Sequence, residues 1–329
     1  MSKRFLISGI LFCLIAASGL LARDSEDFGS KLSPESFKGV FPPEVKTIAV
    51  ISPASLPSTD AALNAVKLLR AANFKVKIYP HAIAPAGKRK FSSYPVEKRL
   101  ADFYAAWNDP ENDLILCTRG GSGTHVLLSK LDWKKLKPRK DVYFLGFSDI
   151  TTLHCALNLR GYGRCLPGPS LRTLPGLNPE IIPMMKAMLN GGKVGPLKLQ
   201  TIVPGECSGY PVAGLLSRLE LAQRTGEIAS TRGKIIFIEN IGGNPERIKK
   251  HLESLYERKF FDGASGLVFC HFTNCGKKET VEAVLKQFAS KLNIPVYKGF
   301  PFGHLPENLV IDLSRKAVIR DGGIVFEAR

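Results

Sequence analysis

One serine in this chain lies at a position where it could act as the nucleophile of a hydrolase. Ser148 lies in the run LGFSDITT at residues 145–152, between a short apolar segment and a helix-like segment. A serine at a bend from strand to helix is exposed at the sheet edge, and the N–H groups at the helix start can hold the oxyanion that forms when an acyl carbon is attacked. Because Ser-Asp is also a common helix cap, the segment alone leaves both interpretations open.

A glycine-rich run precedes this serine. The run is RGGSG at residues 119–123, and it also falls between an apolar segment and a helix-like one. Glycines let a backbone come close to a ligand and present its N–H donors, so the run could cradle a phosphate, although it lacks the Lys-Ser/Thr ending of a P-loop. Gly120 and Gly121 could instead complete an oxyanion hole, or the run could be a tight turn.

An acid and a histidine in the second half of the chain could complete such a site. Glu239 ends the apolar run at residues 234–238, and His304 lies in FPFGHLP at residues 300–306. In a parallel sheet, functional groups gather at the carboxyl ends of strands. His271, just after another apolar run, is the alternative base. The other histidines lie in a helix or have no partner pattern: His81, His125, His154 (predicted core) and His251.

The elements that must position these residues alternate between strand and helix over residues 46–165. This alternation favours an N-terminal α/β domain built on a parallel sheet covered on both faces. Apolar runs of four to six residues, some alternating, predict the strands, and amphipathic spacing predicts the helices. The expected strands are 47–52, 74–79, 114–118 and 142–147, and the expected helices are 60–72, 95–107, 124–131 and 151–159.

A proline-rich segment follows. Residues 166–205 hold seven of the 22 prolines, which predicts a linker with a short helix over 180–189. After it, residues 206–329 are expected to form a smaller α/β C-terminal domain. Its expected elements are strands at 233–239, 266–270 and 295–299, helices at 245–259 and 277–291, and a hairpin or meander within 309–326.

The first two dozen residues have the layout of a secretory signal peptide. Lys3 and Arg4 precede an almost wholly apolar run at residues 5–21, and small residues at 16–19 suit a cleavage site. We therefore expect residues 1–22 to be a signal peptide, with an uncleaved membrane anchor as the alternative. Either way the body of the protein would be exported, to the periplasm or the cell envelope.

Charge and cysteine content argue against two classes of function, nucleic-acid binding and metal binding. The net charge of +17 is spread thinly and is not interleaved with aromatic residues, which disfavours nucleic-acid binding and favours a solvated basic face that attracts anionic wall polymer. The chain has no CxxC pair and no Cys/His cluster at metal-ligand spacing, so no metal is expected. The cysteine spacing predicts no particular disulfide, and a homodimer is left open.

Taken together, the segments match a known pattern. Four segments occur in a fixed order: RGGSG at residues 119–123, GFSDIT at 146–151, a strand ending in Glu239, and FGH at 302–304. This order resembles the LD-carboxypeptidase family of serine peptidases, which includes the microcin-immunity peptidases. The resemblance extends from about residue 47 to residue 310. It includes RLAD at residues 99–102, where the family carries a similar Arg–Asp pattern.

The resemblance implies a catalytic triad. Ser148 would be the nucleophile, His304 the general base, and Glu239 the residue that orients the histidine. The backbone N–H groups of Asp149 and of the Gly120–Gly121 turn would form the oxyanion hole. The family's two-domain fold implies a site in the cleft between the domains, and no metal or organic cofactor.

The family's activity implies hydrolysis of an L,D-peptide bond in murein tetrapeptides with release of terminal D-alanine. Some segments depart from the family pattern: LPGP at 166–169 lacks a histidine, AGLLS at 213–217 lacks an asparagine, and Asn240 follows Glu239 in place of aspartate. These departures keep two alternatives open. One is a microcin-type peptidyl-nucleotide amidase, and the other is a non-catalytic wall-binding protein on the same scaffold.

Overall fold

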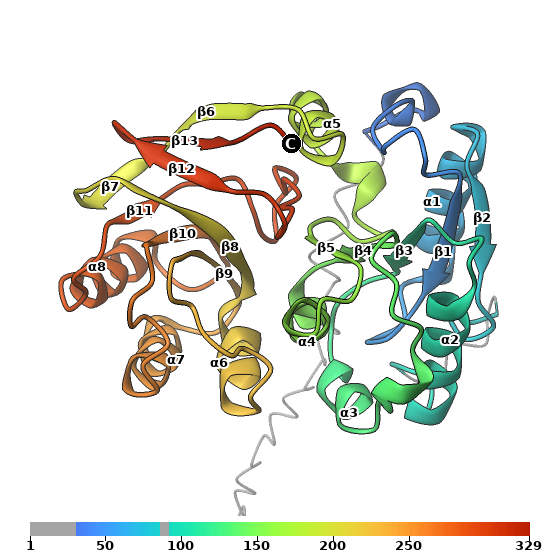
Figure 1. Cartoon of the computed structure of the whole chain (residues 1–329), viewed down its shortest axis with the longest axis horizontal. Helices are drawn as coiled ribbons and strands as arrows, with labels where there is room; N and C mark the ends of the chain where they lie inside the picture. Colours follow the sequence, from blue (N-terminus) through green and yellow to red (C-terminus); the bar gives the residue numbers. More distant parts are fainter. Residues whose placement is uncertain (1–30, 86–91) are drawn as a thin grey trace, which may run out of the picture.

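The computed structural model describes residues 31–85 and 92–329, which form two α/β domains side by side (Figure 1). The first domain contains a sheet of five parallel strands in the order β2-β1-β3-β4-β5. Its inner strands are buried apolar runs, as expected for a parallel sheet. The strands are β1 (Thr47–Ile51), β2 (Lys75–Ile78), β3 (Leu114–Cys117), β4 (Tyr143–Gly146) and β5 (Arg164–Pro167).

Four α-helices connect or follow these strands, and all four are confirmed from the sequence to within two residues at each end. The helices are α1 (Thr59–Ala71), α2 (Val96–Asn108), α3 (Thr124–Ser129) and α4 (Thr151–Leu159). The strand β5 was not predicted. It lies at the edge of the sheet, where a proline at its end is tolerated because the edge needs fewer N–H donors.

The second domain contains a sheet of eight strands in the order β6-β13-β12-β8-β9-β10-β11-β7. Strands β8 to β11 pair in parallel at its centre, and the outer strands pair antiparallel. The strands are β6 (Val194–Lys198), β7 (Gln200–Val203), β8 (Cys207–Leu215), β9 (Lys234–Ile241), β10 (Gly266–Thr273), β11 (Val296–Lys298), β12 (Ala317–Arg320) and β13 (Gly323–Phe326). The predicted C-terminal hairpin is confirmed as β12 and β13.

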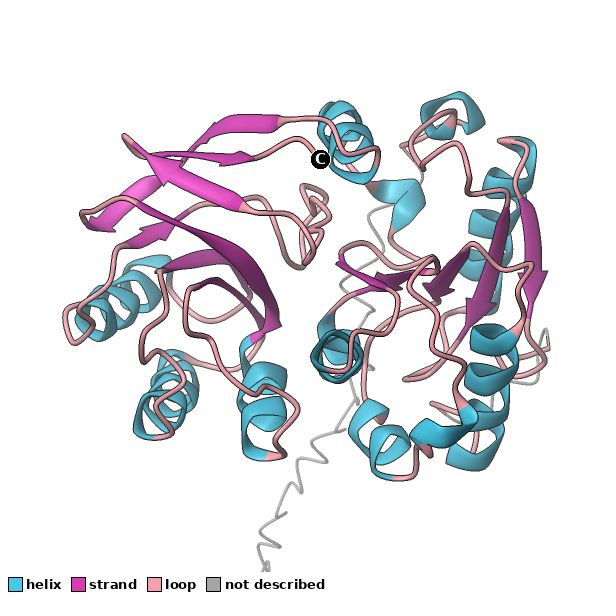
Figure 2. Cartoon of the chain, in the orientation of Figure 1, coloured by secondary structure: helices cyan, strands magenta, loops and turns pink. Residues whose placement is uncertain are grey.

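Three helices lie along one side of this second sheet (Figure 2). They are α6 (Leu216–Arg224), α7 (Pro245–Glu257) and α8 (Lys278–Ala289), with α5 (Ile182–Leu189) between the two domains in the chain. The sequence predicted α7 and α8 but missed α6 and the strand β8 before it.

The prediction of a linker over residues 166–205 was wrong in one respect, because this segment contributes two strands to the second sheet. Strand β6 carries Pro196 and pairs only with β13, while β7 pairs only with β11. Both strands lie at the edges of the sheet, where a proline can stand without breaking a ladder on both sides. Their partners lie roughly 90 to 130 residues further along the chain, so local sequence patterns could not reveal the pairing.

The two domains share a hydrophobic core. A single cluster of buried side chains joins the first sheet to the second, including Phe144 from β4 and Phe237 from β9. The segment 309–313 runs beside β5, where the Ile311 N–H donates to the Pro167 carbonyl at 2.8 Å. The domains are therefore held together by packing and by backbone hydrogen bonds.

Across residues 31–85 and 92–329, no helix combines the length and apolarity needed to cross a bilayer. The signal peptide expected over residues 1–22 lies outside this range. The six cysteines in this part of the chain are free thiols: Cys117, Cys155, Cys165, Cys207, Cys270 and Cys275.

Candidate active site

Ser148 occupies a strained turn at the carboxyl end of β4. The strand ends at Gly146, and a short 3-10 turn over Ser148–Ile150 leads directly into α4. Ser148 has a backbone φ of +65°, and only 6% of its surface is exposed. A positive φ is costly for a residue with a side chain and is found where the structure fixes a functional group. This is the strand–turn–helix elbow expected for a nucleophile.

The glycine-rich turn after β3 lies against this serine. A methyl group at Gly120 would stand 2.7 Å from Ser148 Cβ and 2.9 Å from its Oγ. Gly121, with φ +101°, instead packs against Ser55, whose Oγ accepts the N–H of Ser122 at 3.1 Å. The structure thus brings Gly120 against Ser148, as the sequence suggested. At Gly121, Ser55 fills the space that a side chain would occupy.

The Asp149 carboxylate fixes the two turns against each other. Its Oδ2 accepts hydrogen bonds from the N–H and the hydroxyl of Thr124, each at 2.9 Å, and so caps the start of α3. Arg99 also holds the glycine-rich turn, because its guanidinium donates to the Gly123 carbonyl at 3.1 Å. Burial lowers the pKa of this guanidinium. Arg99 and Asp102 do not act as a pair, because Asp102 binds His81 instead.

Glu239 and His304 form a buried pair in the second domain. The His304 Nδ1 and Glu239 Oε2 are 2.8 Å apart, and both side chains are fully buried. A carboxylate oxygen accepts, so the Nδ1–H of His304 donates to Glu239, and in the neutral form of this tautomer Nε2 is the basic nitrogen. The predicted contact between these two residues is confirmed. Gly303, with φ +134°, allows the approach, since a methyl group there would lie 3.1 Å from Glu239 Cβ.

The nucleophile turn and the histidine meet across the domain boundary. The ring of Phe147, which directly precedes Ser148, lies 4.7 Å from the His304 ring between centroids, at an interplanar angle of 49°. The turn that carries Ser148 and the loop that carries His304 are therefore in contact across the domain boundary.

His271 lies beside the same glycine, Gly303. Its Cβ would be 3.1 Å from a methyl group on that glycine, and its backbone N–H donates to the Phe302 carbonyl at 3.1 Å. Burial lowers the pKa of His271, and its side chain lines a separate cavity of about 500 Å³ together with Leu305. His304, and not His271, is therefore the histidine that holds the Glu239 carboxylate.

Three of the remaining histidines have partners elsewhere in the fold. His154 is fully buried in α4, as predicted, and its Nε2 donates to the Gly146 carbonyl at 2.8 Å. His251 pairs with Glu220 at 3.1 Å. The sequence had shown no partner for His81, whose Nδ1 in fact lies 3.0 Å from Asp102 Oδ1.

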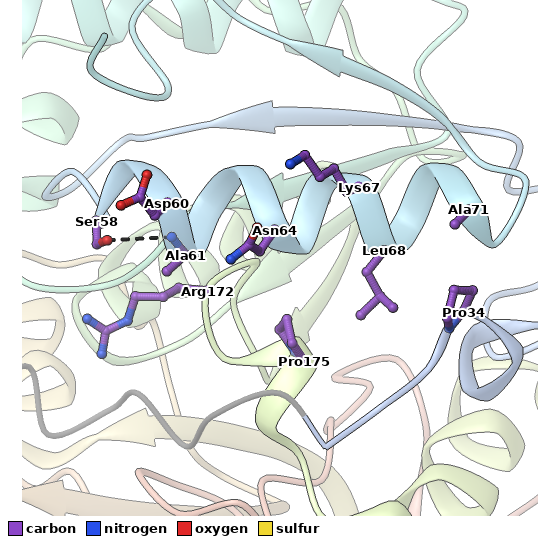
Figure 3. A pocket seen from close by; sticks show the side chains of 10 residues that line it. All are labelled: Pro34, Ser58, Asp60, Ala61, Asn64, Lys67, Leu68, Ala71, Arg172 and Pro175. Carbon is purple, nitrogen blue, oxygen red and sulfur yellow. Dashed lines mark hydrogen bonds between the residues drawn. The ribbon is translucent and has the colours of Figure 1, made fainter. Parts of the chain in front are cut away.

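Another cavity, of about 570 Å³, lies along one face of α1 (Figure 3). Its lining includes Asp60, Lys67 and Arg172, but none of the three triad candidates. Ser58 caps the same helix by accepting the Ala61 N–H at 3.5 Å. In the part of the chain that the structure describes, no group of three or more His, Cys, Asp or Glu side chains could hold a metal ion.

Comparison with known proteins matches both domains to one family. Residues 48–164 match the family model of the LD-carboxypeptidase N-terminal domain, and residues 208–319 match that of the LD-carboxypeptidase C-terminal domain. A probable murein peptide carboxypeptidase of Bacillus subtilis is 29% identical over 288 residues, covering 83% of this chain and 88% of that protein. A murein tetrapeptide carboxypeptidase of Pseudomonas aeruginosa is 25% identical, covering 83% and 92%.

Solved structures share the fold. A muramoyltetrapeptide carboxypeptidase from Oxalobacter formigenes superposes with a TM-score of 0.74 at 24% identity, covering 85% of this chain and 97% of that one. The microcin C7 self-immunity protein MccF gives a TM-score of 0.74 at 22% identity, covering 88% and 98%. At this identity the likeness shows the fold alone. With both domain models matched in order, the chain belongs to the LD-carboxypeptidase family of serine peptidases.

Proposed function

We propose that this protein is a serine-type LD-carboxypeptidase that hydrolyses the L,D-peptide bond of murein tetrapeptides and releases terminal D-alanine. The observation that carries the proposal is the buried Glu239–His304 pair, whose histidine ring lies against the residue preceding Ser148. The relatives named as murein peptide and murein tetrapeptide carboxypeptidases, which cover most of the chain, support the substrate class.

In the proposed mechanism, Nε2 of neutral His304 takes the hydroxyl proton as Ser148 Oγ attacks the carbonyl carbon of the scissile bond. Glu239 keeps the proton on Nδ1 and stabilises the imidazolium that forms. The backbone N–H groups of Asp149, Gly120 and Gly121 would stabilise the oxyanion. His304 then gives its proton to the departing amine of D-alanine, which leaves an acyl-enzyme on Ser148. Water, activated by the same histidine, hydrolyses this ester and regenerates the serine.

Two measurements test the proposal. Muropeptides incubated with the pure protein and analysed by mass spectrometry should lose one terminal alanine from tetrapeptides and leave tripeptides unchanged. A fluorophosphonate probe should label Ser148, because it reacts with activated serines whatever the natural substrate is. A protein that labels at no serine and leaves tetrapeptides intact would instead be the non-catalytic wall-binding protein on this scaffold.

The alternative substrate is a peptidyl nucleotide, as in the microcin-immunity peptidases. The solved structures of MccF support this alternative only at the level of the fold, because they are at most about one quarter identical to this chain. Cleavage of an aminoacyl sulfamoyl adenosine, with tetrapeptides left intact, would favour the amidase.

We also propose that the protein works outside the cytoplasm, in the periplasm or cell envelope, after export by a signal peptide at residues 1–22. The basic and apolar layout of these residues supports this, and the net charge of +17 suits contact with anionic wall polymer. The membrane would be reached only through that segment. Fractionation of cells that produce the full chain, or a chain lacking residues 1–22, tests export. Light scattering of the purified protein tests for a homodimer.

A further inference from the structure

Helix α4 of the first domain packs against α6 of the second, and an ion pair joins the two domains beside each end of this helix pair. At one end the Arg218 Nε lies 2.9 Å from Asp149 Oδ1, and at the other the Arg160 Nη1 lies 2.5 Å from Glu227 Oε2. The first pair joins residues at the start of the two helices and the second joins residues just beyond their ends, so the two helices run in the same direction.

The first of these pairs lies at the nucleophile. Asp149 directly follows Ser148 and is fully buried, while the Arg218 side chain keeps 25% of its surface exposed. The Nε–H does not point along the line to Oδ1, so the contact is an ion pair and not a hydrogen bond. The other carboxylate oxygen caps α3 through Thr124. One carboxylate therefore connects the Ser148 turn, the glycine-rich turn and the second domain.

The same end of α6 is tied to the strand that carries Glu239. Leu215, the last residue of β8, is paired in register with Glu239 on β9. Its N–H donates to the Thr151 hydroxyl at 3.1 Å, and Gly214 has no room for a methyl group because the Thr151 side chain lies against it. A short path of contacts thus leads from Glu239 through the end of β8 to the first turn of α4.

We propose that Arg218 is a positioning residue, which holds Ser148 in place relative to the Glu239–His304 pair through Asp149. The proposal rests on the proposed function, because it assumes that these three residues react together. Removing the arginine would leave a buried carboxylate without its interdomain partner, which favours a displaced turn. Displacement of a reacting group by about 1 Å can cost on the order of 10²-fold in rate.

The test compares Arg218→Leu with Arg160→Leu in the full-length protein. Arg160→Leu is a matched control, since it removes the interdomain ion pair at the opposite end of the same helix pair, away from Ser148. For Arg218→Leu, we expect kcat for D-alanine release and the rate of fluorophosphonate labelling at Ser148 to fall together by about 10²-fold, with KM nearly unchanged. Arg218→Lys should recover part of both rates, and Arg160→Leu should stay within about twofold of wild type.

Three results would overturn the positioning role while leaving the proposed function intact. They are a wild-type labelling rate in Arg218→Leu, an equal loss in Arg160→Leu, and a loss confined to KM. If Arg218→Leu fails to fold, Arg218→Gln keeps a polar side chain of similar length without the charge, and the same comparison applies. Failure of the wild-type protein itself to label or to release D-alanine would count against the proposed function.

Discussion

At the scale of single residues, the site depends on one hydroxyl held in a strained turn. Ser148 has little packing of its own to lose beyond that hydroxyl, so we expect Ser148→Ala to keep the fold while it abolishes hydrolysis. The expected loss is on the order of 10⁴-fold or more if the serine forms the acyl-enzyme. Steady-state release of D-alanine and thermal unfolding, measured on the same preparation, check both parts. Retention of most activity would remove Ser148 from the mechanism.

Substitution of Glu239 should lower kcat less than substitution of His304. A carboxylate that orients the base is less critical than the base itself, as other triads show. We expect His304→Ala to cost on the order of 10⁶-fold in kcat and Glu239→Gln on the order of 10⁴-fold. Single-turnover kinetics on a murein tetrapeptide would measure both. Losses in the reverse order would mean that Glu239 does more than orient the ring.

The variant Gly120→Ala tests whether activity needs the close approach between the glycine-rich turn and the Ser148 turn. Since a methyl group at this position would stand 2.7 Å from Ser148 Cβ, Gly120→Ala must push one turn away from the other. We expect a loss of at least about 10²-fold in kcat with the fold retained. Gly192→Ala is the control, because a methyl group there would meet its nearest neighbour at an ordinary 3.5 Å. Equal activity of the two variants would contradict the role of the Gly120 turn.

At the scale of elements, the histidine of α4 braces the strand that leads to the nucleophile. His154 binds the carbonyl of Gly146, the last residue of β4, and complete burial lowers the pKa of this histidine from 6.5 to about 4. Well above pH 6.5 the imidazole is neutral in both the folded and the unfolded chain. As the pH falls through 6.5, the imidazole gains a proton in the unfolded chain, but in the folded chain it stays neutral down to about pH 4. The free energy of unfolding should therefore fall by about 3 kcal/mol over this range.

Urea unfolding at pH 7, 6 and 5 measures this slope. His154→Gln removes the titrating group and should flatten the slope by the contribution of one histidine, although it lowers stability at neutral pH. His125→Gln, at an exposed position on α3, should leave the slope as it is in wild type. An unchanged slope in His154→Gln would show that the unfolding transition does not depend on this buried imidazole.

The elements that the sequence predicted are those with a local pattern. Helices such as α1 and α7 have amphipathic spacing and side-chain caps of their own, and β1, β3 and β4 are compact apolar runs. The edge strands β6 and β7 were missed, because their stability depends on partners far along the chain. The triad candidates were found from residue type, order and family resemblance. Arg218 was not, because nothing near it in the sequence indicates that its partner is Asp149.

At the scale of the whole molecule, the active site requires two domains to keep a fixed relation. The contacts that fix it are extensive: the packed helices α4 and α6, the segment 309–313 beside β5, and a buried cluster that includes side chains from both sheets. A core shared in this way makes separate unfolding of either domain costly, because each would expose apolar surface on the other. The domain relation that the site needs is thus part of the stability of the fold.

This shared core predicts a single cooperative unfolding transition, and the chain offers a direct way to see it. Both tryptophans, Trp107 and Trp133, lie in the first domain, so their fluorescence reports on that domain alone, while far-ultraviolet circular dichroism reports on the helices of both. We expect the two urea transitions to coincide. Gly168→Ala should separate them, since a methyl group there would lie 2.9 Å from Val310 Cγ2 and push the segment 309–313 away from β5. Separate transitions in the wild-type protein would show that the domains unfold independently, and the site would then depend on local contacts such as the Asp149–Arg218 pair.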